Sequence, residues 1–472
     1  MSKTYDVIIV GAGTSGLTAR RVVAQKTDNY IVVDDGPLGT TCARVGCMPS
    51  KVLIQVANDY QRREKHLQMG IKGSESLELD SKRVMEYVRS LRDRFVRGVT
   101  SSTPEWESHL VRKKATFVDS HTLDLEGETV RAKKIILAVG SRPILPKSWE
   151  PFKSHLLSTD QFFELEELPK TIAVIGLGVI GSELGQALSR LGVKVIGINI
   201  GKAIGGSSDP ELQEYIYKQM QKEMIVHTGG ANLIEINENN KLIVEAEGKR
   251  YEVDKALVSA GRVSNVDKLG LDKLGIELNQ RGLPHIHWNT MAIKDAPYIF
   301  LPGDSNGDRP ILHEAADEGT IAGYNAVHDE QCFKRRTPLA ITFSDPNIAS
   351  VGMNYSLLIE KQVDFVTGKV SFEGQGRSIT KNKEVGLLHV YADKQSRKIL
   401  GAEIYAPDGE HLAHLLAWAI SLDLTVFEAL RMPFYHPVVE EGLRTALRNC
   451  ARQLSLPDHG QELFRCDDPP IR

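Results

Sequence analysis

Two cysteines near the start of the chain have the spacing of a redox pair. Four residues separate Cys42 from Cys47, so their thiols can close a small disulfide ring, and the segment continues through Pro49 to Lys51. Proline suits the first turn of a helix, and a thiolate at a helix N-terminus is stabilised by the helix dipole and by a nearby cation. We therefore expect a reactive thiol here. The alternatives are two reduced core cysteines or half of a zinc site, but no second cysteine pair completes a zinc site.

A second candidate lies near the other end of the chain, where Glu441 follows His436 by five residues. Histidine moves protons to and from thiols near neutral pH, and a carboxylate can fix its tautomer. The spacing alone is a weak signal, because the chain has 14 histidines. The three remaining cysteines are Cys332, Cys450 and Cys466. They are more typical of incidental or buried thiols than of catalysts, and Cys466 is a minor candidate for a redox relay.

The first of two glycine-rich turns lies between an apolar run at residues 6–10 and a helix-like stretch at 17–26. Its glycines allow a tight turn, close approach to a pyrophosphate and close packing of helix on strand, and the helix N-terminus offers free N–H groups to the phosphates. Asp34 ends the next strand, where a carboxylate can bind ribose hydroxyls. The spacing predicts a dinucleotide site. The three glycines are Gly11, Gly13 and Gly16.

The second glycine-rich turn repeats this arrangement between a strand at residues 171–175 and a helix-like stretch at 182–191. The strand after that stretch ends at Asn199, which is neither an acid nor a cation. Two such turns imply two nucleotides, and a bound flavin with an exchanging nicotinamide is the economical pairing, because flavin mediates between hydride and thiol chemistry. The glycines are Gly176, Gly178 and Gly181.

Composition restricts the class of protein. The chain has 472 residues and a formal net charge of −3, so no global bias toward nucleic acid or an anionic membrane is present. No apolar stretch approaches the ~20 residues that span a bilayer. Five cysteines in so long a chain do not make a secreted disulfide framework, so we expect a cytoplasmic protein.

Further elements must position these residues. A strand at 134–138 leads to Gly140, and a strand at 256–260 leads to Gly261. Residues 208–211 have the capping acid and early proline of a helix start. From about residue 337 the pattern indicates another domain. We expect helices at 51–69, 81–99, 411–421 and 440–453, and strands near 348–351, 386–392 and 399–404.

At these motifs the sequence resembles the pyridine nucleotide–disulfide oxidoreductases with a redox-active disulfide, and most closely their dihydrolipoamide dehydrogenase branch. The resemblance runs from Gly11 to Glu441 in consistent order. Residues 38–51 are similar to the family's disulfide segment, whose Pro-Ser-Lys ending is similar to the lipoamide branch. The other matching segments are 260–265, 302–304, 346–352 and the His436–Glu441 pair.

The resemblance implies roles for these residues. Cys47 would be the charge-transfer thiol against a non-covalently held FAD, and Cys42 the thiol that exchanges with substrate. Lys51 would lie near flavin N5, paired with Glu183. His436 would come from the partner subunit of a homodimer. Further residues expected at the cofactors are Thr41, Gly140, Gly261, Gly303 and Asp304, the last meeting the ribityl chain.

Five positions depart from the family pattern. Thr40 replaces a glycine beside the flavin phosphates, and Asn199 replaces a glutamate, so both concern nucleotide handling. Tyr435 stands where many lipoamide enzymes have a small residue and could reshape the disulfide entrance. The two other departures are Ser264 for proline and Asn347 for glutamate.

We thus expect an α/β fold with two Rossmann-like dinucleotide-binding domains and a C-terminal α+β dimerisation domain. The FAD domain would comprise residues 1–150 and 267–336, the nicotinamide domain 151–266 and the interface domain 337–472.

The expected reaction oxidises a dihydrolipoyl dithiol through the Cys42–Cys47 disulfide and FAD, with hydride passing to NAD+; NADP is not excluded. Lipoyl-bearing subunits of a 2-oxoacid dehydrogenase complex would be the partners, and no metal is expected. The alternatives are an NAD(P)H-dependent reductase of another disulfide or electron acceptor, and a non-catalytic flavoprotein binding subunit, for which the cysteine and histidine pairs would be unnecessary.

Overall fold

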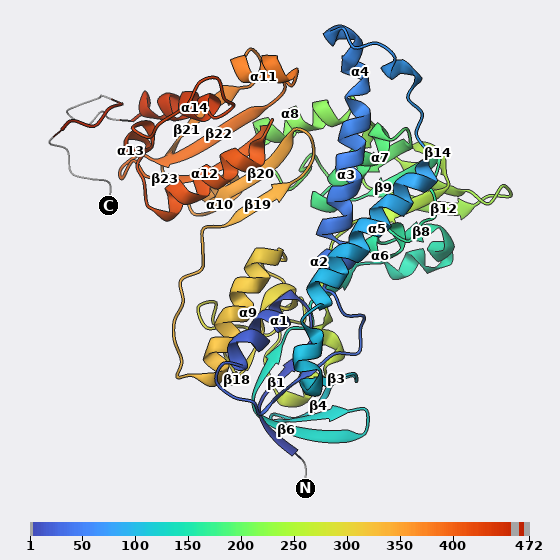
Figure 1. The fold of residues 1–472 in the computed structure, drawn as a ribbon, viewed down its shortest axis with the longest axis vertical. Coiled ribbons are helices and arrows are strands. Elements are labelled where there is room, and N and C mark those ends of the chain that lie inside the picture. Colours follow the sequence, from blue (N-terminus) through green and yellow to red (C-terminus); the bar gives the residue numbers. More distant parts are fainter. Residues whose placement is uncertain (1–2, 455–461, 467–472) are drawn as a thin grey trace. The chain divides into compact units, whose positions relative to one another are not determined.

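The computed structural model describes residues 3–454 and 462–466, and the chain divides into two compact units (Figure 1). The first unit comprises Met1–Ser50, Glu86–Ile144 and Gly261–Arg335, and the second comprises Lys51–Met85, Leu145–Ala260 and Arg336–Arg472. The mixed α/β class expected from the sequence is confirmed.

A largely parallel sheet forms the centre of the first unit. Its apolar strand β1 (Lys3–Val10) pairs in parallel with β2 (Tyr30–Val33) on one side and β6 (Glu128–Leu137) on the other. Side chains 7–9 of β1 are fully buried, as expected of a strand covered on both faces. The sheet order is β17-β18-β6-β1-β2-β3. The other strands are β3 (Leu110–Val111), β4 (Thr116–Asp119), β5 (Thr122–Leu125), β7 (Ser141–Pro143), β16 (Arg262–Ser264), β17 (Ala292–Ile293) and β18 (Ala296–Phe300).

Two helices pack on this sheet: α1 (Thr14–Val23) and α9 (Leu312–Val327). They approach very closely, because a Cβ atom on Gly319 would lie 2.3 Å from the carbonyl oxygen of Ser15. The helix α9 was not predicted from the sequence. Its apolar residues are interrupted by buried Glu314 and Glu318, which hide the amphipathic period.

A parallel sheet in the order β11-β10-β9-β15-β8 forms one core of the second unit. An antiparallel meander of short strands, missed in the sequence, also belongs to this core. The strands are β8 (Leu156–Leu157), β9 (Thr171–Ile175), β10 (Lys194–Ile198), β11 (Ile225–His227), β12 (Asn232–Ile236), β13 (Leu242–Ala246), β14 (Lys249–Val253) and β15 (Lys255–Val258); the helices are α6 (Thr159–Phe162), α7 (Val179–Arg190) and α8 (Pro210–Met220).

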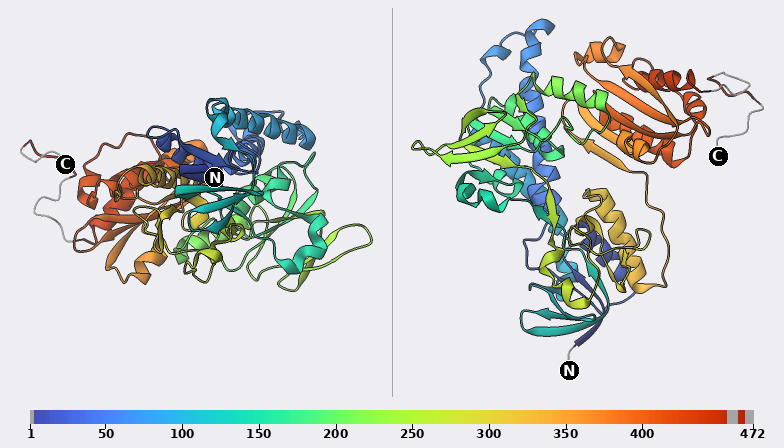
Figure 2. Two further views of the ribbon diagram at one scale, coloured as in Figure 1. Left: turned by 90° about the horizontal axis from the view of Figure 1, so that it is seen from below. Right: turned by 180° about the vertical axis from the view of Figure 1, so that it is seen from behind.

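The other core of the second unit is an antiparallel sheet in the order β19-β20-β23-β22-β21. Helix α12 (Gly409–Ser421) packs on β20 and β23, and α14 (Glu441–Ala451) packs on β21 and β22 (Figure 2). The strands are β19 (Leu339–Thr342), β20 (Asn347–Gly352), β21 (Phe365–Ser371), β22 (Leu387–Asp393) and β23 (Ile399–Ala406); the smaller helices are α10 (Tyr355–Glu360), α11 (Gly376–Lys381) and α13 (Val426–Leu430).

Residues 51–85, expected within the FAD domain, belong to the second unit. The expected helix at 51–69 is interrupted: α3 (Cys47–Gln61) is followed by α4 (Arg63–His66) and a 3₁₀ turn at Leu67–Met69. Two more helices complete the described chain: α2 (Thr41–Val45) and α5 (Ser81–Thr100). Over the residues that the structure describes, no helix is both long and apolar enough to cross a membrane.

Alternation along β22 separates an apolar face from a polar one. Leu388 and Val390 join the helix-covered core, whereas His389 and Tyr391 reach Asp209 at the start of α8, at 2.8 and 2.9 Å from Oδ2. Asp209 also caps α8, because its Oδ1 accepts from two backbone N–H groups of the first turn. The helix start expected at 208–211 is thus confirmed. One buried carboxylate therefore links the two cores of this unit.

This link generates a stability prediction. Burial opposes ionisation, but hydrogen bonds from His389 and Tyr391 lower the pKa of Asp209 from its usual 3.8 to about 2. A lowered carboxyl pKa stabilises the folded state above the unfolded pKa, and the contribution is lost as pH falls from about 4 toward 2. We expect Asp209→Asn, which keeps a capping side chain, to lower stability at pH 7 by about 2 kcal/mol and to flatten the acid limb.

Thermal unfolding between pH 2 and pH 7 measures this effect. The matched control is Asp408→Asn, which removes a half-buried ion pair with Lys381 in the same unit. An acid limb for Asp209→Asn that is as steep as that of the unaltered protein would contradict the assignment.

Candidate active site

The segment that holds Cys42 and Cys47 doubles back on itself. Cys42 lies half-buried in α2, and Cys47 is exposed at the first position of α3. Between them, Gly46 packs so closely that a Cβ atom there would lie 3.3 Å from the Cα atom of Cys42. The fold-back brings the chain entering α3 against Cys42. The thiol at residue 47 begins a 15-residue helix, the position in which a helix dipole favours a thiolate.

Backbone strain lies directly beside this segment. Thr40 has φ +57° and ψ 149°, a conformation that a β-branched residue rarely adopts and that costs of order 1–3 kcal/mol. Its hydroxyl accepts a hydrogen bond from the N–H of Ala43 at 3.3 Å and caps α2. The geometry explains why glycine is usual at this position.

An ion pair joins α3 to α7. The Lys51 ammonium lies 2.9 and 2.8 Å from the two carboxylate oxygens of Glu183. Glu183 is only 3% exposed, so its charge requires the partner. Its Oε1 also accepts from the backbone N–H of Phe343 at 2.8 Å. The pairing expected for Lys51 and Glu183 is present, and their role beside a flavin stays a prediction.

The histidine pair is also assembled. His436 Nδ1 lies 2.9 and 3.1 Å from the oxygens of Glu441, the first residue of α14. Hydrogen bonding to His436 lowers the pKa of the Glu441 carboxyl, so an ionised carboxylate accepts the Nδ1 proton. Nε2 is then the ring nitrogen that can accept a proton from a ligand. The His436 side chain is 81% exposed, and it is therefore open to a partner from outside its own chain.

The first glycine turn has the geometry of a phosphate cradle. Gly11 has φ +105°, and a Cβ atom there would lie 2.3 Å from the carbonyl oxygen of Ala138. The N-cap of α1 is Gly13, whose position carries no side-chain cap, so the first N–H groups of the helix are open to a ligand. Asp34 accepts from the N–H of Ala12 at 2.6 Å.

The second glycine turn repeats this geometry. Gly176 has φ +92°. Among the described residues, no heavy atom lies within 4 Å of a Cβ atom built on Gly178, apart from its two chain neighbours and the backbone of its own helix. Asn199 takes the place of Asp34, because its Oδ1 accepts from the N–H of Leu177 at 3.0 Å. Its amide group donates to the carbonyl oxygens of Gly201 and Ala203. Asn199 thus braces its own loop.

A third segment of the first unit gathers the residues expected at the flavin chain. Asp304 lies in the 3₁₀ turn Gly303–Asn306, where its Oδ2 accepts from the Ser141 hydroxyl at 3.0 Å. Buried Glu318 accepts from the N–H of Gly303 at 2.7 Å and so fixes this turn. Sequence reasoning missed Glu318. An acid within an apolar helical stretch was the available signal. Gly140 and Gly261 both adopt positive φ in this unit, and Thr41 is exposed at the start of α2.

The remaining cysteines differ in environment. Burial raises the pKa of the Cys450 thiol to about 12, which makes it inert as a nucleophile. Cys332 and Cys466 are exposed. Within residues 3–454 and 462–466, no cluster of three or more histidine, cysteine or acidic side chains could hold a metal ion.

Comparison with known proteins decides the family. Residues 5–319 match the pyridine nucleotide-disulphide oxidoreductases, and residues 339–447 match the dimerisation domain of the same proteins. The chain belongs to this family. It is therefore an oxidoreductase that acts on sulfur groups, and the family binds FAD and a pyridine nucleotide. The resemblance inferred from the motifs is confirmed.

Several relatives cover nearly the whole chain. The dihydrolipoyl dehydrogenase of Geobacillus stearothermophilus is 30% identical over 92% of this chain and 94% of its own, and that of Bacillus subtilis is 28% identical over the same shares. Two solved structures share the fold. LpdA of Mycobacterium tuberculosis has a TM-score of 0.80 at 21% identity, and the flavoprotein disulfide reductase RclA of Escherichia coli has 0.77 at 19%; each match covers 96% of this chain and 100% of theirs.

The glycine geometry separates two kinds of substitution. Gly178→Ala adds a methyl group where the protein has open space and a pyrophosphate would approach. We expect this variant to fold with an unchanged melting temperature and to bind the pyridine nucleotide on the order of tenfold more weakly, a change of 1.4 kcal/mol. Calorimetric titration of the FAD-loaded protein with nucleotide measures the affinity.

The contrasting variant is Gly181→Ala. Its Cβ atom would lie 1.8 Å from the carbonyl oxygen of Gly176, so we expect a loss of stability before any effect on binding. Equal melting temperatures for both variants would show that the close approach at Gly181 is wrongly described.

Proposed function

We propose that the protein oxidises a dihydrolipoyl dithiol and delivers the electrons to NAD+. The observation that carries the proposal is the His436–Glu441 pair, with Nδ1 held by a carboxylate at 2.9 Å and Nε2 left for proton transfer. The positions of Cys42 in α2 and of Cys47 at the start of α3 support the substrate class, as do the dihydrolipoyl dehydrogenases among the relatives.

The residues of the chain would act in sequence. His436 takes the proton of one substrate thiol, and the thiolate attacks the sulfur of Cys42, so that Cys47 leaves as a thiolate. The second substrate sulfur then attacks the mixed disulfide and closes the oxidised ring, and the Cys42 sulfur leaves. Bound FAD would supply the two-electron chemistry that links the Cys47 thiolate to the nicotinamide. In the first unit, Asp34, Asp304 and the N-terminus of α1 would hold the FAD.

We further propose that the active form is a homodimer. The outer face of α12 exposes Leu415, Trp418 and Leu422, by 43, 69 and 61%. These residues lie at i, i+3 and i+7, so they form one apolar stripe on the domain that matches the family's dimerisation domain. His436, 81% exposed, would then serve the cysteines of the partner. Lipoyl-bearing subunits of a 2-oxoacid dehydrogenase complex remain the proposed partners, and a cytoplasmic location stays a prediction.

One observation favours a second candidate. Tyr435, directly before His436, is 80% exposed, and a bulky ring beside the base would restrict a lipoyl arm. A reductase of another disulfide on the same scaffold would tolerate it. A non-catalytic binding subunit is the weakest alternative, because such a role requires neither the cysteine pair nor the histidine pair.

Variants of the two pairs test the proposal. We expect His436→Gln to lower turnover of dihydrolipoamide by about two to four orders of magnitude, because the dithiol proton has no acceptor. Reduction of FAD by NADH should survive, since hydride transfer needs no thiol proton. Cys47→Ser should abolish the long-wavelength thiolate–flavin absorption of the two-electron-reduced protein. Glutathione disulfide serves as the alternative substrate.

Loss of the NADH half-reaction in His436→Gln would contradict the assigned role. Full turnover in Cys47→Ser would overturn the redox role of the cysteines. Mixing the two disabled subunits tests the dimer, because a heterodimer should recover roughly one active site if the sites are shared between chains. Faster reduction of glutathione disulfide than oxidation of dihydrolipoamide would favour the reductase.

We propose that NAD is preferred over NADP, with weak discrimination. Asn199 carries no charge to repel a 2′-phosphate, and both of its amide hydrogens point to backbone carbonyls. The nearby cation Lys202 is paired with Glu214 at 2.6 Å, so its charge is compensated. No arginine pair stands in this loop to grip a phosphate in the bidentate manner.

A carboxylate at residue 199 should sharpen the preference. We expect Asn199→Glu to raise the ratio of kcat/KM for NAD over NADP about tenfold by charge repulsion. The control Asn199→Gln keeps the length of glutamate without its charge, and it should leave the ratio near that of the unaltered protein. A preference of the unaltered protein for NADP would overturn this proposal. It would also favour the assignment of the protein as a biosynthetic disulfide reductase.

A further inference from the structure

Helices α3 and α7 are joined at two points with the same spacing. Lys51 of α3 pairs with Glu183 of α7, and seven residues further along each helix Asn58 Oδ1 accepts from the Arg190 guanidinium at 2.6 Å. Seven residues are close to two helical turns, so both contacts lie on one face of each helix. The second contact therefore fixes how α3 presents Lys51 to Glu183.

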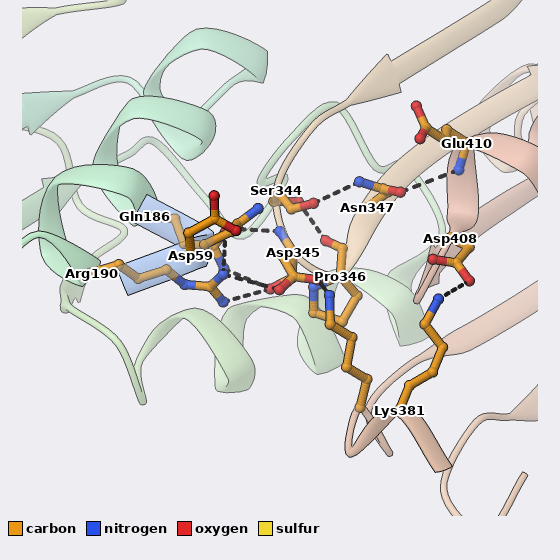
Figure 3. A network of polar contacts seen from close by, with 12 residues as sticks. Asp59, Gln186, Arg190, Ser344, Asp345, Pro346, Asn347, Lys381, Asp408 and Glu410 are labelled. Atoms are coloured by element: carbon orange, nitrogen blue, oxygen red, sulfur yellow. Dashed lines mark hydrogen bonds and ion pairs between the residues drawn. The ribbon is translucent and has the colours of Figure 1, made fainter. Parts of the chain in front are cut away.

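The segment between β19 and β20 is bonded to α7 through three side chains of one helical face. Glu183 accepts from the N–H of Phe343 at 2.8 Å. Gln186 accepts from the N–H of Asp345 and donates to its carbonyl oxygen, at 2.8 and 2.9 Å. Arg190 donates to the same carbonyl oxygen at 2.8 Å. Three side chains of α7 thus hold this segment, and Figure 3 shows two of them, Gln186 and Arg190, beside Asp345.

Asp345 is the charged centre of this network. Its Oδ2 lies 3.1 Å from Arg190 and its Oδ1 lies 2.8 Å from Lys383 (Figure 3). Burial opposes ionisation, but the positive charges of Lys383 and Arg190 lower the pKa of the Asp345 carboxyl. Arg190 is 9% exposed and also pairs with Glu223 at 2.8 Å. The guanidinium is therefore held between two carboxylates, and it cannot move without leaving a buried charge unpaired.

Phe343 links the segment between β19 and β20 to Lys51. The Lys51 ammonium lies 4.6 Å from the centre of the Phe343 ring, within cation–π distance. Lys51 is thus held by a carboxylate and a ring, and both of these are fixed by the segment that ends at Asp345. The ion pair is a bonded part of a network that reaches from α3 through α7 to the antiparallel sheet.

We propose that Asp345 is a positioning residue, which acts through Arg190 and residues 343–345 to hold the Lys51 ammonium and so tunes the reduction potential of bound FAD. The inference rests on the proposed function and on the place beside flavin N5 that the family resemblance implies for Lys51. A cation fixed there stabilises the reduced, electron-rich flavin. A cation whose position varies stabilises the reduced flavin less.

The experiment measures the potential of FAD in the holoenzyme by equilibration with a reference dye, together with the rate of FAD reduction by NADH. Both measurements are made without a dithiol substrate. We expect Asp345→Asn to lower the potential in the same direction as Lys51→Met and to slow reduction on the order of fivefold. Adding Asp345→Asn to Lys51→Met should cause no further change, because the residue through which it acts is gone.

The matched control is Lys381→Met, which breaks the neighbouring Lys381–Asp408 ion pair (Figure 3) without touching α7. It should leave the potential unchanged. Asn58→Ala is the second variant, used if Asp345→Asn does not fold; it removes only the α3 contact to Arg190 and should shift the potential in the same direction.

The outcomes separate this inference from the proposed function. An unchanged potential in Asp345→Asn or Asn58→Ala, with a shift in Lys51→Met, overturns the inference alone. Additive shifts in the double variant overturn it also, because Asp345 would then act by another route. An unchanged potential in Lys51→Met contradicts the proposed place of Lys51 and the inference with it. Dihydrolipoamide turnover, measured separately, tests the substrate.

Discussion

The buried carboxylate of Glu183 is the constraint around which the second unit is arranged. A carboxylate that is 3% exposed requires a charged partner and hydrogen bonds, because its burial without them costs free energy. Lys51 supplies the charge and Phe343 the backbone N–H, so α3 and the β19–β20 segment have to meet at α7. This pairing is one reason why residues 51–85 belong to the same compact unit as α7, which follows much later in the chain.

The two glycine turns are built on one plan but end differently. In each, the residue at the end of the following strand accepts a hydrogen bond from the second residue of the turn: Asp34 from Ala12, and Asn199 from Leu177. A carboxylate at this position places a negative charge at the end of the strand, whereas a carboxamide is neutral and can also donate hydrogen bonds. Those donors bond to the loop, so Asn199 contributes shape and order more than electrostatic selection.

The proposed proton transfer and the proposed electron transfer use residues from different parts of the chain. The histidine pair lies at the start of α14, with the His436 side chain exposed. Cys42 lies in α2 beside the strained backbone of Thr40, and Cys47 begins α3. In the proposed reaction, the exposed histidine serves the cysteines of a second copy of the chain. The exposed apolar stripe of α12 is a surface on which that copy could pack.

The sequence by itself determined the motifs whose chemistry is local. Glycine spacing dictates the two turns because a Cβ atom on Gly11, Gly16, Gly176 or Gly181 would clash with the backbone, and the apolar strands beside them leave little choice of fold. Only the tertiary structure decided what depends on distant residues. Glu318, Arg190 and Asp345 gave no periodic signal, and the meander β12–β14 is short and partly polar. Their roles arise from contacts that close only after folding, because a buried charge reveals its partner only in three dimensions.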